Sequence, residues 1–199
     1  ITDHTDLVSG LDFKDIDNDG DMDLLSSSYY DNKVAWFEHI DGSGTFGTQN
    51  IVTDTLMKAA DIFAADFDSD GYNDILSASI ERDRLVWFKN VNGSGSFDDS
   101  RIITKTAEYS RSHLTVDLDG DGDNDVLSAS YSDDRLAWYE NLDGLGTFGI
   151  QKTVSADIIE ASFVCSEDFD NDGDFDIIVS GKENDEIILF KNSEGNALE

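Results

Sequence analysis

The sequence predicts an all-β protein, a propeller built of four-stranded antiparallel blades. The phrase Asp-x-Asp-x-Asp-Gly-x-x-Asp occurs four times, and each copy starts 51 residues after the one before it. Every 51-residue repeat also holds four short apolar segments that turn-forming residues separate. Four short strands in a repeat of this length are typical of a propeller blade, so the four repeats predict four blades.

The second repeat shows the four predicted strands in order. Residues 62–65 lead into the aspartate loop, 75–80 follow it, 85–89 form the third strand, and 97–104 form the fourth after a glycine-rich turn. These runs are short, rich in β-branched and aromatic residues, and bounded by glycine, asparagine and aspartate, which favours strands over helices. The aspartate loop therefore joins two strands.

The third predicted strand carries large apolar side chains on both faces in every repeat. Such a pattern predicts a sheet that packs between two neighbours. An aromatic stripe can also line a ligand groove, but its recurrence at the same depth in each repeat favours packing between blades. The four segments are 34–37, 85–88, 136–139 and 187–190.

Each aspartate loop offers carboxylate oxygens at alternate positions, as a hard divalent cation requires. Aspartate occupies positions one, three, five and nine in all copies, and glycine at position six permits the positive φ that turns the chain around an ion. An ordinary polar turn is the alternative, which four intact copies in one register disfavour. The predicted side-chain ligands are Asp15, Asp17, Asp19, Asp23, Asp66, Asp68, Asp70, Asp74, Asp117, Asp119, Asp121, Asp125, Asp168, Asp170, Asp172 and Asp176.

Calcium is the ion that these loops predict, with one ion in each loop and four per chain. Ligands that are all oxygen favour calcium over zinc or copper, and several carboxylates favour it over magnesium, while manganese stays chemically open. An EF-hand begins in the same way but needs a glutamate at position twelve and flanking helices. Position twelve is here Ser26, Ser77, Ser128 or Val179, and strands follow.

The composition is strongly acidic, with 44 acidic and 13 basic residues among 199 and a formal charge of −31. Four calcium ions would reduce this charge only to −23, so nucleic acids and anionic membrane surfaces are unsuitable partners. Hydrophobic residues make up 39%, which is enough for a core, and no apolar stretch is long enough to insert into a membrane.

No catalytic residue is predicted. Cys165 is the only cysteine, and we interpret it as a packing thiol. His4, His39 and His113 occupy non-equivalent positions in the repeats and are interpreted as surface or packing residues. Nucleophile elbows, phosphate loops and zinc signatures are absent, and the paired carboxylates already belong to the predicted cation loops.

The chain resembles the FG-GAP/VCBS repeat family, which includes the integrin α-chain propeller and many secreted bacterial proteins. The resemblance rests on the aspartate loops, on Leu-Ser-Ala-Ser at 76–79 and 127–130, and on Trp-Phe/Tyr-x-Asn followed by Gly-x-Gly-x-Phe. It covers residues 1–196, whereas Leu198 and Glu199 resemble a cloning remnant, assigned to 197–199. The Phe-Gly-Gly-Ala-Pro tract and all proline are missing, so the bacterial VCBS-like branch fits best.

The resemblance implies that position seven of each loop binds Ca²⁺ through its backbone carbonyl. This carries onto Asp21, Tyr72, Asp123 and Asp174. Family propellers commonly have about seven blades, so the four repeats form a section of a larger propeller, an imperfectly closed ring, or half of a homodimer. Residues 1–3 match only the tail of a fourth strand, and the fourth repeat stops at 192–196 after its third strand. One blade thus lacks most of its fourth strand and leaves an apolar strand edge. We expect this edge to pair with a second copy or with further blades.

The predicted ligand surface lies on the face opposite the metal loops. There the turns between second and third strands vary among repeats, at 29–33, 80–84, 131–135 and 182–186, and so do the connections between blades. Tyrosine, arginine and aspartate in these turns suit a glycan or a protein, although solvated turn residues are the simpler interpretation of any single one.

Together these features predict a calcium-binding, secreted or cell-surface scaffold for adhesion or carbohydrate binding, bacterial and not an enzyme. Millimolar calcium outside cells suits loops of low affinity. An enzyme acting on polysaccharide, or a non-catalytic module of one, is the alternative function, and a spacer in a longer surface protein is the third.

Overall fold

The computed structural model describes residues 5–193, and the regular structure in this range is β-strand apart from one three-residue 3-10 helix. Residues 1–3, His4 and the assigned cloning remnant at 197–199 lie outside the described residues. The chain divides into two compact units, Ile1–Asp66 with Asp70–Lys105, and Phe67–Ser69 with Thr106–Glu199. No helix of the described chain is long and apolar enough to cross a membrane.

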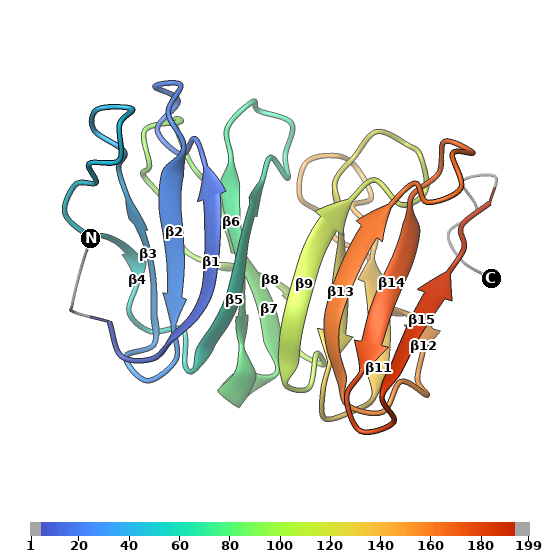
Figure 1. Ribbon diagram of the computed structural model, residues 1–199. Coiled ribbons are helices and arrows are strands. Elements are labelled where there is room, and N and C mark those ends of the chain that lie inside the picture. Colours follow the sequence, from blue (N-terminus) through green and yellow to red (C-terminus); the bar gives the residue numbers. More distant parts are fainter. Residues whose placement is uncertain (1–4, 194–199) are drawn as a thin grey trace. The chain divides into compact units, whose positions relative to one another are not determined.

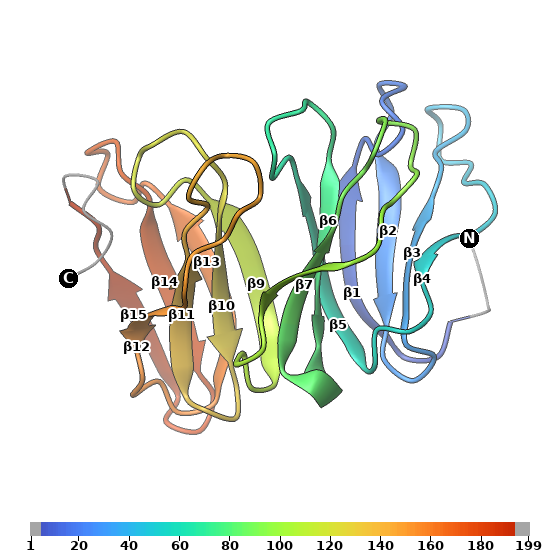
Figure 2. The same cartoon turned by 180° about the vertical axis from the view of Figure 1, so that it is seen from behind.

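Unit one holds two four-stranded antiparallel sheets, and in each the strands lie side by side in chain order (Figures 1 and 2). The short helix η1 (Ile80–Arg82) follows the second strand of the second sheet. The first sheet is β1 (Val8–Lys14), β2 (Asp23–Ser28), β3 (Lys33–Phe37) and β4 (Asn50–Thr53). The second is β5 (Ala59–Ala65), β6 (Asp74–Ser79), β7 (Arg84–Phe88) and β8 (Arg101–Thr104).

Unit two repeats this arrangement with one strand fewer. Its first sheet has the order β12-β11-β10-β9, and its second sheet has the order β13-β14-β15. The strands of the former are β9 (Ser110–Val116), β10 (Asp125–Ser130), β11 (Arg135–Tyr139) and β12 (Lys152–Ser155). Those of the latter are β13 (Ala161–Glu167), β14 (Asp176–Gly181) and β15 (Glu186–Phe190). The fourth repeat therefore has three strands among the described residues, as the sequence predicts.

The all-β prediction and the four-strand repeat are confirmed, and in the second repeat two strand starts differ from the prediction by more than one residue. β5 begins at Ala59 rather than at residue 62, because a bulge between Ala60 and Ile62 lets the strand continue past Asp61, whose φ is +49°. β8 begins at Arg101 rather than at residue 97, because the Gly-x-Gly turn leaves Phe97 in a single isolated bridge to Asn90.

The core of each unit lies between its two sheets. In unit one, Leu25 and Trp36 of the first sheet pack in one buried cluster with Ile62 and Val86 of the second. The sheets approach closely at Gly10, where a β-carbon would lie 2.7 Å from the Cα of Asp61, so no larger residue fits there. An equivalent cluster fills unit two. The predicted packing of the third strand is confirmed for β3, β7 and β11, which are buried from their second residue onward.

The third strand of the fourth repeat differs from this prediction. In β15, Ile187 is 79% and Leu189 44% exposed. On the first sheet, Leu11 and Phe13 of β1 are 58% and 54% exposed. Each of these sheets packs one face in its own unit and presents apolar side chains on the other, which explains why burial of the repeated pattern is not uniform.

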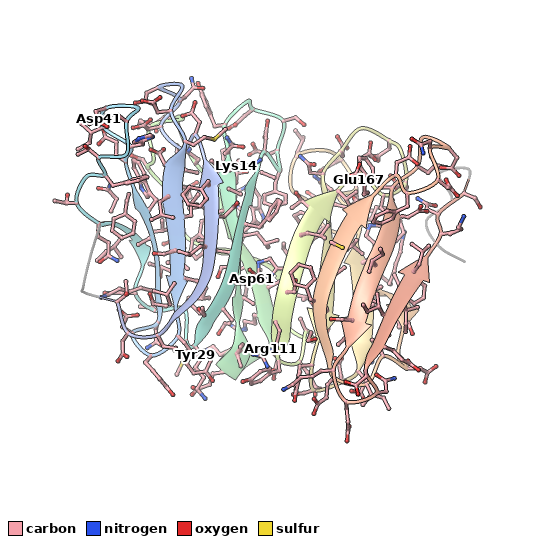
Figure 3. The ribbon with its side chains drawn as sticks, viewed as in Figure 1. Lys14, Tyr29, Asp41, Asp61, Arg111 and Glu167 are labelled. Atoms are coloured by element: carbon pink, nitrogen blue, oxygen red, sulfur yellow. The ribbon has the colours of Figure 1, made fainter. Side chains whose placement is uncertain are left out.

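The two ends of each sheet carry different connections because the strands alternate in direction. In the first sheet, Lys14 marks the end with the aspartate loop and Tyr29 marks the end with the β2–β3 turn (Figure 3). In unit two, Glu167 and Arg111 mark the corresponding ends (Figure 3). The aspartate loops and the variable turns of each sheet therefore lie at opposite ends, as predicted.

Candidate metal centres

The first aspartate of each loop holds the backbone of its own loop. The two oxygens of Asp15 accept hydrogen bonds from the amides of Asp19, at 3.2 Å, and Gly20, at 3.0 Å. The aspartate at position five also binds the loop backbone: Asp19 accepts a hydrogen bond from the amide of Asp21 at 2.9 Å. The second and fourth loops repeat this pattern through Asp66 and Asp168. In the third loop, Asp117 accepts the amides of Gly120 and Gly122, one position earlier for the first bond.

This wrapping brings the first three predicted ligands of every loop together. In each loop, one carboxylate oxygen from positions one, three and five lies within 4.8 Å of the other two. The four groups are Asp15, Asp17 and Asp19; Asp66, Asp68 and Asp70; Asp117, Asp119 and Asp121; and Asp168, Asp170 and Asp172. Three hard oxygen donors at this separation can share one divalent cation.

The aspartate at position nine lies outside these groups and anchors the loop to the sheet. It is the first residue of the second strand and is at most 1% exposed in all four repeats. In the first repeat, Asp23 accepts the amide of Ile16 at 2.9 Å and that of His39 at 2.8 Å. Asp74, Asp125 and Asp176 accept amides of the matching residues. A ligand role for position nine stays a prediction.

The side chain at position seven packs against the Gly-x-Gly turn of its own repeat. At Gly93 (φ +63°), a β-carbon would lie 2.2 Å from the ring of Tyr72, and at Gly144 it would lie 2.4 Å from the carboxylate of Asp123. The Cβ-free turn therefore covers this side chain closely, which is compatible with the implied use of the backbone carbonyl at position seven.

The loop backbone is left-handed at two positions. Gly20 at position six has φ +98°, as predicted, and no atom lies within 4 Å of where its β-carbon would be, so the requirement for glycine is conformational rather than steric. Position four is also left-handed, with Asn18 at φ +62°. Asparagine or glycine stands at position four in three of the four loops and tolerates this conformation, a signal in the sequence that could have predicted it.

Burial makes the charged form of two loop carboxylates unfavourable, and neighbouring acids add to the effect. Burial, with added repulsion from Asp23, Asp19 and Glu38, raises the pKa of Asp17 to about 6. Burial raises the pKa of Asp125 to about 7, against the hydrogen bonds that lower it. A carboxylate whose charged form is this unfavourable gains much from a neighbouring cation.

Two buried carboxylate oxygens test whether a metal fits. Oδ1 of Asp17 and Oδ1 of Asp119 are buried, and neither has a hydrogen-bond partner within residues 5–193. Buried polar atoms normally have a partner, and these two belong to the clusters of three converging oxygens. A divalent cation would supply the missing partner in both loops, so the residues present fit the ion that the sequence predicts.

An asparagine from the following repeat binds each of the first three loops. The Nδ2 of Asn90 donates to the carbonyl of Ile16 at 2.7 Å, across 74 residues of sequence. Asn141 reaches the carbonyl of Phe67 at 2.9 Å, and Asn192 that of Leu118 at 2.7 Å. The asparagine of the Trp-Phe/Tyr-x-Asn pattern, known from the sequence only as a family signature, therefore holds the backbone of the preceding repeat's loop.

The residue just before this asparagine differs between alternate repeats. Lys89 pairs with Asp70 at 2.6 Å, and Lys191 pairs with Asp170 at 2.8 Å and holds the pKa of that carboxyl below its usual value. The matching residue in the first repeat is Glu38, and in the third it is Glu140; burial raises the pKa of Asp119, and repulsion from Asp121 and Glu140 adds to it. The four loops are alike in sequence, but their surroundings differ in charge.

The residues set aside as packing residues lie outside the metal centres, apart from one main-chain contact. His39 stacks on Phe46 with ring centroids 4.9 Å apart and accepts the amide of Gly44, while its own amide binds Asp23. His113 is buried at 4% exposure, and Cys165 is half-buried with a free thiol.

Comparison with known proteins supports the family that these features indicate. A family model described as an FG-GAP-like repeat matches residues 15–77, 66–128 and 117–179, which together span more than half of the chain. A search of curated proteins finds no matching sequence.

Solved structures of similar fold include a lectin from Agrocybe aegerita that recognises non-reducing terminal N-acetylglucosamine. It is 23% identical with a TM-score of 0.65, over 92% of this chain and 48% of the lectin. Virginiamycin B lyase from Staphylococcus aureus is 12% identical with a TM-score of 0.55, over 93% of this chain and 55% of the lyase. The chain thus spans about half the length of these structures, and at such identities the likeness extends to the fold alone. The loops, the sheets and the family match agree, and the chain belongs to the FG-GAP-like repeat family.

Proposed function

We propose that this chain is a calcium-stiffened, non-catalytic binding scaffold that works outside the cell, secreted or on the cell surface of a bacterium. The observation that carries the proposal is the convergence of three carboxylate oxygens within 4.8 Å in each of four loops. Extracellular calcium is plentiful enough to fill loops of modest affinity. The family membership supports the same role.

Calcium would be held by the side chains at positions one, three and five, and we assign positions seven and nine to complete its shell. The ion would supply the positive charge that the crowded carboxylates lack. Asp15 also accepts two loop amides, which hold the loop backbone around the proposed site. Less of the binding free energy is then lost to ordering the chain.

Aromatic and cationic side chains at the turn ends of the sheets support a ligand surface there. In unit one, the rings of Tyr29 and Tyr30 lie 5.2 Å apart, and the Lys58 ammonium lies 5.8 Å from the Tyr29 ring. In unit two, Arg111 and Lys182 lie 5.3 and 5.5 Å from the Tyr131 ring. Such rings stack on sugars and anchor protein interfaces, so we propose a glycan or protein ligand at this end.

Glycan binding is the ligand class to test first, because a lectin of similar fold recognises terminal N-acetylglucosamine. Purified protein on a glycan array should bind in millimolar Ca²⁺ and lose binding in EDTA. Calorimetric titration should return four calcium ions per chain. Fewer than three ions would contradict the metal assignment. Hydrolysis or cleavage of a bound polysaccharide would reject the non-catalytic scaffold and favour the alternative function, an enzyme acting on polysaccharide.

The exposed apolar faces of β1 and β15 support a further proposal about assembly. Leu11 and Phe13 on one sheet, and Ile187 and Leu189 on the other, would be covered by a second copy or by further blades. Light scattering over a concentration series should therefore show association that rises with concentration. A strict monomer at the highest concentration would remove the second copy as the partner.

A further inference from the structure

A pocket of about 160 Å³ lies in unit one, away from the aspartate loops. Thr53 and Thr55, at the end of β4, form one side of it, and the β7–β8 pair forms the other. Val86, Phe88 and Ile102 supply apolar lining. At about 30 Å³ per water molecule, this space holds roughly five waters, which suits one small ring and not an extended chain.

Two guanidinium groups line this pocket. Arg82 is the last residue of η1, and Arg84 is the first residue of β7. Arg82 donates from Nε to the sulfur of Met57 at 3.0 Å. Within residues 5–193, neither arginine pairs with a carboxylate. The buried Nε of Arg84 has no hydrogen-bond partner there, but neither has that of Arg135, its counterpart in the third repeat, so the feature that distinguishes this pocket is the second guanidinium, Arg82. Two neighbouring guanidiniums without an anion are unusual in a chain with 44 acidic residues.

The other repeats explain why this charge is special to the second one. In the first repeat, Asp31 pairs with Lys33 at 2.9 Å, and in the third, Asp133 pairs with Arg135 at 2.8 Å. The second repeat keeps the basic residue, as Arg84, but has Arg82 where the acid stands. The repeat frame therefore does not require a second base at this position, and its presence points to a ligand.

The chemistry of the lining selects the ligand. Paired guanidiniums bind a carboxylate through parallel N–H···O bonds. Thr53, Thr55 and Ser100 add hydroxyls, and the apolar residues suit the C–H face of a sugar ring. The net charge of −31 opposes an anion, but exposed charges are screened beyond about 8 Å at physiological salt, so the two arginines dominate locally.

We propose that this pocket binds the carboxylate of an acidic monosaccharide unit, with Arg82 and Arg84 holding the carboxylate and the β7–β8 face packing on the ring. The inference rests on the proposed binding role and names a ligand class for it. It places that ligand between β4 and the β7–β8 pair.

The test is binding of D-glucuronate and D-glucose, measured by calorimetry in saturating Ca²⁺. We expect glucuronate to bind at least tenfold more tightly than glucose. Arg84→Gln should weaken glucuronate at least tenfold. Arg82→Asp, which recreates the pairing found in the first and third repeats, should abolish binding while keeping the melting temperature. The matched control is Arg101→Gln, because Arg101 lies over the Trp87 ring in the same unit and outside the pocket.

Three results would overturn the inference. The first is equal affinity for glucose and glucuronate, and the second is glucuronate binding that Arg82→Asp leaves unchanged. The third is inorganic phosphate that binds as tightly as glucuronate, because the sugar ring would then contribute nothing. The proposed scaffold fails separately. Glycan-array binding that persists in Arg82→Asp would keep the scaffold and reject this pocket. Glucuronate binding in a protein that takes up fewer than three calcium ions would reject the metal assignment and keep the pocket.

Discussion

Removal of calcium is expected to lower the melting temperature by roughly 5–10 °C for each loop emptied. A site filled at a hundredfold over its Kd stabilises the folded state by about 2.7 kcal/mol. In a chain of this size, 1 kcal/mol corresponds to roughly 2–4 °C. The emptied loops also hold carboxylates whose charged form is unfavourable: burial, with added repulsion from neighbouring acids, raises the pKa of Asp17.

Differential scanning calorimetry in EDTA and in millimolar Ca²⁺ measures this effect. Excess Ca²⁺ added after EDTA should restore the melting temperature, and Mg²⁺ at the same concentration should restore it much less. An identical melting curve in EDTA and in Ca²⁺ would refute a structural role for the ions.

Calcium affinity is expected to alternate along the chain, with loops one and three binding more tightly than loops two and four. Lys89 and Lys191 are tethered cations that occupy loop carboxylates, and a calcium ion must displace them. Glu38 adds negative charge beside the first loop, and Glu140 stands at the same place beside the third loop, where Lys152 pairs with it and offsets part of its charge. Exposure to solvent weakens each of these interactions, and their opposite signs still favour the first and third loops.

Lys89→Gln should therefore tighten calcium binding at the second loop about tenfold, and Glu38→Gln should weaken the first loop. Calorimetric titration should resolve two affinity classes of site in the wild type. In each variant, one site should change from one class to the other. Lys33→Gln is the matched control, because Lys33 makes an ion pair of similar length, with Asp31, at the turn end. Four equal sites that Lys89→Gln leaves unchanged would contradict the prediction.

The repeat period explains how much of the fold was accessible from the sequence. Once the aspartate loops were aligned at 51 residues, the four short apolar runs of each repeat predicted the strands, and the short fourth repeat predicted the three-stranded sheet. Boundaries failed where backbone conformation and not composition decided them, as at the bulge beside Asp61. The exposure of Ile187 could not be predicted, because a repeated pattern does not say whether a neighbour covers it.

The candidate site was predictable within each loop and not beyond it. Positions one, three and five converge because their geometry depends on nine consecutive residues. The partners of the loop were missed because they lie far along the chain: Asn90 reaches Ile16 across 74 residues, and Lys89 reaches Asp70 across 19. Four loops that look equivalent in sequence therefore acquire different surroundings in the folded chain.

The asparagine bonds between repeats couple each of the first three loops to the repeat that follows it. Asn90 donates a hydrogen bond to the carbonyl of Ile16, which lies between Asp15 and Asp17. A change in the conformation of the first loop therefore acts directly on the second repeat. Asn192 links the fourth repeat to the third loop in the same way, through the carbonyl of Leu118. An ion that stiffens one loop thereby lowers the entropy cost of ordering the next repeat. Calcium binding to neighbouring loops would then be cooperative, with a binding curve steeper than independent sites give.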